Sequence, residues 1–143
     1  MKLVVDANII IAALIRQSAT RLLLMDEGLE LFSPEYMLAE LEEHWQEIIS
    51  KAKPEKEDFE KVLGVFKSRI KFVKPEMFAI FRKYARQASP DKKDAEYLAL
   101  AMYLGEDAAL WSNDKKLKQQ NFVKIYSTLD LLKIAGFDEN LLK

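Results

Sequence analysis

LVVDANIIIAAL, from Leu3 to Leu14, is the stretch that decides the fold of this 143-residue chain. Its first three residues form a short apolar run that is typical of a buried strand. The segment 8–15 that follows, NIIIAALI, predicts a helix buried on most of its sides. Asp6 interrupts the apolar run where the strand gives way to the helix, and a carboxylate at that point needs a structural or a chemical reason.

Composition sets the first limits on function. The length fits one domain, residues 1–143, with room for a substantial core. The absence of cysteine excludes disulfides, thiolate zinc sites and cysteine nucleophiles. The formal net charge of −1, from 22 basic and 23 acidic residues, excludes a strongly basic nucleic-acid coat. It leaves open a local basic patch beside an acidic site.

The sequence has no run that predicts a membrane span or a secretory signal. No apolar run approaches the roughly 20 residues that a helical span needs. The N-terminus has a single lysine, Lys2, then a strand-like run and an early acid, which is a poor signal peptide. We therefore expect a soluble, cytoplasmic protein that is not in a membrane.

Strand-like and helix-like segments alternate along the rest of the chain. Further strands are expected at 29–33, 70–74, 108–112 and 123–127. Further helices are expected at 19–28, 34–52, 54–69, 75–88, 91–105 and 128–136. In the helix at 34–52, Ser33-Pro34 predicts the start, as a capping hydroxyl followed by a proline. The alternation predicts a three-layer α/β/α fold with a central parallel sheet of about five strands.

Four acids are expected at one edge of that sheet, because ligand sites of parallel sheets lie beyond the carboxyl ends of the strands. Asp6 directly follows the first strand, and Asp114 closely follows the fourth. Asp94 is in the first turn of the helix before the fourth strand, and Glu40 is on the helix after the second. Each has a structural alternative: a helix cap for Asp6 and Asp114, a helix-dipole contact for Asp94, and a solvated face for Glu40. Four such contacts need not fall at one edge, so the group favours a site.

The mutual repulsion of clustered carboxylates must be offset in a folded protein. Two of them about 4 Å apart repel by roughly 4 kcal/mol at an effective dielectric of 20. Protonation or a bound cation relieves the repulsion. Oxygen ligands without cysteine favour Mg²⁺ or Mn²⁺, which serve phosphoryl transfer.

Four motifs together resemble the PIN-domain family, including its VapC-like toxins, and the resemblance covers the chain from Lys2 to about Gly136. In chain order they are VVDANIII, SPEYMLAELEE, DKKDAEYLALAMYLG and ALWSNDKKL. The resemblance implies a metal-dependent ribonuclease with an acidic site, often the toxin of a toxin–antitoxin pair, and it implies dimers. Carried over by motif, the metal-binding and catalytic acids are Asp6, Glu40, Asp94 and Asp114.

The resemblance also implies supporting residues. Asn8 matches a polar residue that orients the first acid by hydrogen bonding. Ser112 matches a hydroxyl that either binds a ligand oxygen or caps the next turn, and the two roles stay open. For Asp91 we expect an outer or a capping role first. Glu43 is an alternative outer ligand, although a solvated surface position is favoured.

Basic residues flank the expected site. They are candidates for contacts with RNA phosphates, with a solvated face as the competing interpretation: Arg16, Arg21, Lys92, Lys93, Lys115 and Lys116. Trp45 and Trp111 lie in apolar contexts and are expected in the core rather than stacked on bases. For His44, the only histidine, a structural role is favoured over that of a general base.

The leading hypothesis is a Mg²⁺- or Mn²⁺-dependent endoribonuclease, with RNA as substrate and an antitoxin protein as a possible partner. The alternative is a non-catalytic PIN-fold module that binds RNA or protein. A phosphate-receiving signalling domain is disfavoured, because the third strand ends at Lys74-Pro75 without the aspartate that such a domain needs.

Overall fold

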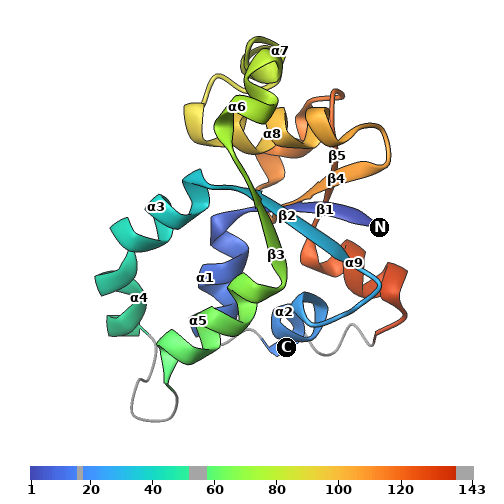
Figure 1. Ribbon diagram of the computed structural model, residues 1–143. Helices are drawn as coiled ribbons and strands as arrows, with labels where there is room; N and C mark the ends of the chain where they lie inside the picture. The colour runs from blue at the N-terminus through green and yellow to red at the C-terminus, as the bar shows by residue number, and fades with distance from the viewer. Residues whose placement is uncertain (16–17, 52–57, 138–143) are drawn as a thin grey trace.

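The computed structural model describes residues 1–15, 18–51 and 58–137 of the chain, and it confirms the three-layer α/β/α fold (Figure 1). Every neighbouring pair of strands in the sheet is parallel, in the order β3-β2-β1-β4-β5. The strands are β1 (Lys2–Val5), β2 (Glu30–Pro34), β3 (Ile70–Val73), β4 (Ala108–Trp111) and β5 (Lys124–Tyr126).

Helices connect the strands and cover both faces of the sheet. The α-helices are α1 (Ala7–Ile15), α2 (Ser18–Leu24), α3 (Tyr36–Glu43), α4 (Trp45–Lys51), α5 (Phe59–Ser68), α6 (Pro75–Phe78), α7 (Arg82–Ala88), α8 (Lys92–Leu104) and α9 (Thr128–Ala135). Two 3₁₀ helices are η2 (Ala79–Phe81) and η3 (Lys115–Gln119). In the described part of the chain, no helix has the length and apolar character to cross a bilayer.

The two helical layers are built around α1 and α8. On one face, α1 contacts α2, α3, α4 and α5, and α2 contacts α9. On the other face, α8 lies against β1, β2 and β4, and α6, η2 and α7 pack on its outer side (Figure 1). The helix α1 packs against other helices, as expected from its apolar sequence, and α8 packs against both the sheet and other helices.

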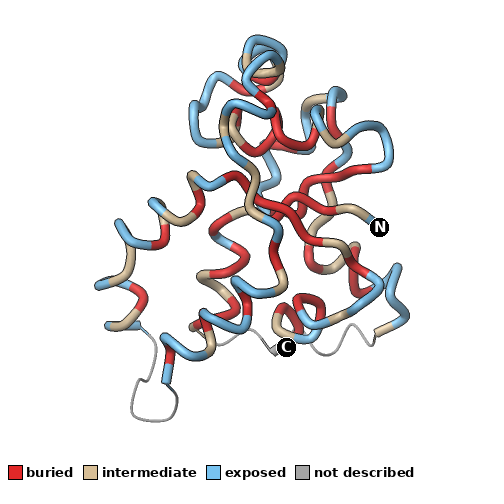
Figure 2. The backbone as a smooth tube through the Cα atoms, viewed as in Figure 1, coloured by how far each residue is buried: buried red, intermediate tan, exposed pale blue. Residues whose placement is uncertain are grey.

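Burial follows the sheet and these two helices, as the red tube in Figure 2 shows. In β1, Leu3, Val4 and Val5 are fully buried, so its nearly continuous apolar character matches a central parallel strand. Trp111 at the end of β4 is also fully buried, which confirms its expected core position. Trp45 is only half-buried, although it packs against the core.

The predicted start of the helix at 34–52 is wrong. Pro34 pairs with Val73 of β3, and the N–H of Glu35 donates to the Val73 carbonyl at 3.1 Å, so the strand continues where a helix start was expected. The Ser33 hydroxyl is buried and donates to the carbonyl of Val5 at 3.1 Å instead of capping a helix. Sheet pairing with β1 and β3 therefore overrides the local capping signal.

The expected long helix at 34–52 is two helices. The chain turns at His44, whose backbone angles of φ −97° and ψ 6° are not helical, and α4 begins at Trp45. The expected helix start at Pro54 lies outside the described residues. Within them, α5 begins after Asp58, whose side chain accepts the backbone N–H of Lys61 at 3.3 Å.

The topology brings the ends of several elements to one edge of the sheet. Because all five strands are parallel, β1 and β4 end at the same edge, and the strand order changes direction between them. The helix α8 must return the chain to the opposite edge before β4 begins, so the first turn of α8 lies at the carboxyl edge. The start of α3, after β2, lies there too.

Candidate functional site

Asp6 is held at the carboxyl end of β1 by hydrogen bonds to both carboxylate oxygens. Its Oδ1 accepts the backbone N–H of Asn8 at 3.1 Å, and its Oδ2 accepts the hydroxyl of Ser112 at 3.1 Å. Burial raises the pKa of Asp6, the two hydrogen bonds oppose the rise, and the charge of Asp114 adds to it. Asp6 is thus a cap for α1 and also a fixed, half-buried carboxylate beside a second acid. The N–H of the Asn8 backbone makes this contact.

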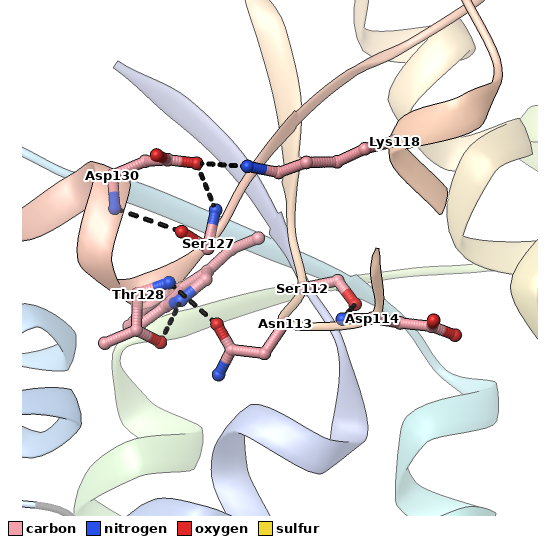
Figure 3. A network of polar contacts seen from close by, with 8 residues as sticks. Ser112, Asn113, Asp114, Lys118, Ser127, Thr128 and Asp130 are labelled. Atoms are coloured by element: carbon pink, nitrogen blue, oxygen red, sulfur yellow. Dashed lines mark hydrogen bonds and ion pairs between the residues drawn. The ribbon is translucent and has the colours of Figure 1, made fainter. Parts of the chain in front are cut away.

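Ser112 connects Asp6 with the loop that carries Asp114. Its hydroxyl accepts the backbone N–H of Asp114 at 3.2 Å (Figure 3). The same hydroxyl donates to Oδ2 of Asp6. Asp114 in turn accepts the backbone N–H of Lys116 at 3.0 Å and caps η3. The Ser112 hydroxyl therefore links Asp6 to the Asp114 loop, and its contact with the Asp114 N–H caps the turn, which is one of the two roles that the sequence left open.

A second polar network, which the sequence did not reveal, anchors the same loop from behind (Figure 3). The Asn113 side chain accepts the backbone N–H of Thr128 at 2.8 Å, and the Thr128 hydroxyl accepts the indole N–H of Trp111 at 3.1 Å. One residue earlier, Ser127 and Asp130 form a reciprocal capping box at the start of α9. The residues that precede Asp114 are thereby tied to the β5–α9 junction.

Glu40 accepts a hydrogen bond from a buried tyrosine of α8. The Tyr97 phenol donates to Oε1 of Glu40 at 2.5 Å, across 57 residues of sequence. Burial raises the pKa of Glu40, the bond from Tyr97 opposes this, and the charge of Asp6 raises it further. Sequence reasoning missed Tyr97, although its position three residues after Asp94 places it on the same helix face.

Asp94 has the most strongly perturbed carboxyl group of the four. Burial, followed by the charges of Asp91, Asp114, Asp6 and Glu40, raises its pKa to about 6. Hydrogen bonds are absent from the causes of this shift, in contrast to Asp6 and Glu40. The other three acids thus lie close enough to Asp94 for their charges to raise its pKa.

Asp91 lies at the N-cap of α8. Its Oδ1 accepts the backbone N–H of Lys93 at 2.8 Å, which confirms the expected capping role. Its charge is also the second cause of the raised pKa of Asp94. Glu43 is exposed, as expected for a solvated position.

The acidic side chains, as the structure places them, do not form a complete metal-binding site. Among the described residues, no three His, Asp or Glu side chains are placed so that they could hold one ion together. The chemistry of the donors nevertheless fits a hard divalent cation, because the groups are carboxylate oxygens whose negative charges raise the pKa values of their neighbours. A cation between them would remove that repulsion.

The candidate phosphate-binding residues fall into three groups. Lys92, Lys93, Lys115 and Lys116 are exposed in the first turns of α8 and η3, directly beside Asp94 and Asp114. The Arg21 guanidinium donates to the carbonyls of Ala13 and Leu14 at 2.6 and 3.2 Å, so it caps the C-terminus of α1. Arg16 lies outside the described residues. The four lysines thus form a basic rim at the acidic site.

His44 has a structural position at the turn between α3 and α4. Its Nδ1 lies 3.6 Å from a carboxylate oxygen of Glu47, one turn further along. Together with Asn8 and Lys51, these residues line a recess of about 300 Å³ between α1 and α4. The expectation that His44 serves the fold agrees with this placement.

Comparison with known proteins identifies the family. A family model described as the PIN domain matches residues 4–128, and the chain belongs to the PIN-domain family. Among solved structures, the chain is similar to one in the crystal structure of VapBC2 from Rickettsia felis bound to a DNA fragment from their promoter. That similarity has a TM-score of 0.65 at 18% identity and covers 89% of this chain and 98% of that chain, so it concerns the fold. No curated protein matches the chain.

Proposed function

We propose that this protein is a Mg²⁺- or Mn²⁺-dependent endoribonuclease that hydrolyses RNA phosphodiester bonds at Asp6, Glu40, Asp94 and Asp114. The observation that carries the proposal is the cluster of carboxylates at the carboxyl edge of the sheet, where the charges of four others raise the pKa of Asp94. Membership of the PIN-domain family supports it.

In this proposal the residues have three roles: cation binding, orientation of Asp6 and binding of RNA phosphates. The four acids would hold the divalent cation, which when bound activates water and stabilises the charge of the reacting phosphate. Ser112 and the backbone N–H of Asn8 fix the orientation of Asp6, so that this carboxylate needs no reorganisation. The lysine rim would bind the phosphates on either side of the cleaved bond.

Cleavage of a mixed RNA pool tests the proposal directly. We expect the wild type to cleave with Mn²⁺ or Mg²⁺ and to lose cleavage with a chelator. Asp6→Asn and Asp114→Asn should reduce cleavage by at least about 100-fold, because each removes a negative charge that holds the cation. Both variants should still bind RNA through the lysines, which filter binding can measure.

Asp107→Asn is the matched control. Asp107 is exposed and lies just before β4, at the edge of the sheet opposite Asp114, so the same substitution should leave cleavage unchanged. Wild-type protein that binds RNA but cleaves none of the pool with either metal would favour a non-catalytic module. Full activity in Asp114→Asn would place the chemistry elsewhere.

We also propose that the protein works in the cytoplasm, with an antitoxin as its partner, and that it forms a homodimer. The similar solved structure is of VapBC2, which supports a partnered protein. The surface of α6, η2 and α7 exposes Met77, Ile80 and Tyr84, of which Ile80 is 77% exposed, and this supports an interface between copies. Light scattering should give a dimer that Ile80→Asp dissociates, and a monomeric wild type would overturn the homodimer.

A further inference from the structure

Tyr97 lies one helical turn after Asp94 on α8 and is only 3% exposed. Its phenol donates the 2.5 Å hydrogen bond to Oε1 of Glu40 on α3. The backbone of Ala7, the residue that follows Asp6, lies near this hydroxyl and lowers the pKa of Tyr97. One buried hydroxyl thus joins the three elements that carry Asp6, Glu40 and Asp94.

The bond leaves Glu40 with one engaged oxygen and one open oxygen. In the described part of the chain, its hydrogen bond comes from Tyr97 and reaches Oε1. Glutamate has a flexible side chain, and fixing it in one conformation costs rotamer entropy. A partner that fixes the side chain in advance removes part of this cost from cation binding.

We propose that Tyr97 is a positioning residue for Glu40: its hydroxyl binds one carboxylate oxygen and thereby holds the other in place for the divalent cation. This inference rests on the proposed function, because it needs a cation at the acidic site. The phenol suits the role, since it is buried and its hydroxyl donates directly to the Glu40 carboxylate.

Tyr97→Phe tests the role, because it removes the hydroxyl and retains the ring that packs in the core. We expect the affinity for Mn²⁺, measured by isothermal titration calorimetry, to fall about tenfold or more, in the range typical of outer partners of metal ligands. We expect kcat to fall with it while KM for RNA is unchanged. Tyr103→Phe is the matched control on the same helix, since Tyr103 is exposed and contacts Phe81 through its ring.

A double-mutant cycle separates positioning from a general effect on the fold. In the Glu40→Gln background, Tyr97→Phe should cause no further loss of Mn²⁺ affinity. A second measurement uses the wild-type chain labelled with 3-fluorotyrosine, in which Mg²⁺ should shift the fluorine resonance of Tyr97 and leave that of Tyr103 in place.

Three results would overturn the inference. The first is a Tyr97→Phe variant that binds Mn²⁺ as tightly as the wild type. The second is a loss of Mn²⁺ affinity on Tyr97→Phe that is equally large in the Glu40→Gln background. The third is a Tyr97 fluorine resonance that does not shift at Mg²⁺ concentrations that saturate the site. Each of these leaves a working metal site and so leaves the proposed function standing. A wild type that binds neither metal overturns both together.

Discussion

Asp6 and Asp114 each make a local capping contact while their charges meet at the edge of the sheet. From the sequence, a helix cap and a place in the site were alternative roles for these two residues. In the structure each carboxylate accepts a backbone N–H as a cap, and a neutral donor of this kind leaves the negative charge in place. Asp94 differs, because a place in the first turn of α8 should favour its charge by about 0.3–1 kcal/mol. Its raised pKa means that burial and four neighbouring carboxylates outweigh the helix dipole.

Asp94→Asn should stabilise the metal-free protein at neutral pH. The pKa of Asp94 is raised from 3.8 to about 6, so the folded state binds a proton more tightly than the unfolded state. The resulting penalty is absent below about pH 3.8, grows as the pH rises towards 6 and is constant above it. Urea unfolding with a chelator between pH 4 and 7.5 should show a gain for the variant that shrinks as the pH falls.

The exposed Asp107→Asn is the control for this pH series, with no expected gain. An Asp94→Asn protein that is less stable than the wild type at pH 7 would indicate that the helix-dipole contact is the dominant role of Asp94.

At the scale of elements, the loop after β4 owes its shape to contacts with the start of α9. Asn113 and Trp111 both bind Thr128, through its backbone and its hydroxyl respectively (Figure 3). The Lys118–Asp130 ion pair of 2.8 Å joins η3 to α9 beside them. Asp114 therefore lies in a segment that is held on the Asp6 side by the Ser112 hydroxyl and on the other side by contacts with the start of α9.

Thr128→Val should destabilise the protein by about 1–3 kcal/mol, because it leaves the indole N–H of Trp111 buried without an acceptor. The two side chains have nearly the same shape, so a packing change contributes little. Thr128→Ser keeps the acceptor and is the control, with a smaller loss expected in urea unfolding. Equal stability of Thr128→Val and the wild type would mean that water or another group satisfies the indole.

At the scale of the whole molecule, the sheet order decides which residues can form a site. β1 occupies the centre, between β2 and β4; the helix α8 contacts β1, and the helix α3 contacts the neighbouring strand β2. The site thus draws on residues from positions 6 to 114, and its formation depends on the complete fold. Unfolding of β1, α3, α8 or β4 would separate the acidic side chains.

Mn²⁺ should therefore raise the stability of the whole fold. A ligand that binds only the folded state adds RT ln(1 + [L]/Kd), which is about 2.7 kcal/mol at a concentration of 100 Kd. We expect this gain for the wild type and for Asp107→Asn in urea unfolding, and little or none for Asp6→Asn. An equal gain in Asp6→Asn would mean that the cation binds outside the candidate site.

The sequence by itself determined the strands, most of the helices and the place of the acids at strand and helix ends, because these depend on short-range periodicity and capping chemistry. It could not settle the end of β2 or the turn at His44, where pairing with β3 and packing outweighed local signals. Only the tertiary structure decided the strand order and the contact between Tyr97 and Glu40, which lie 57 residues apart. An aromatic residue at helical spacing indicates a core position, and the reach of its hydroxyl depends on which helix the fold places opposite it.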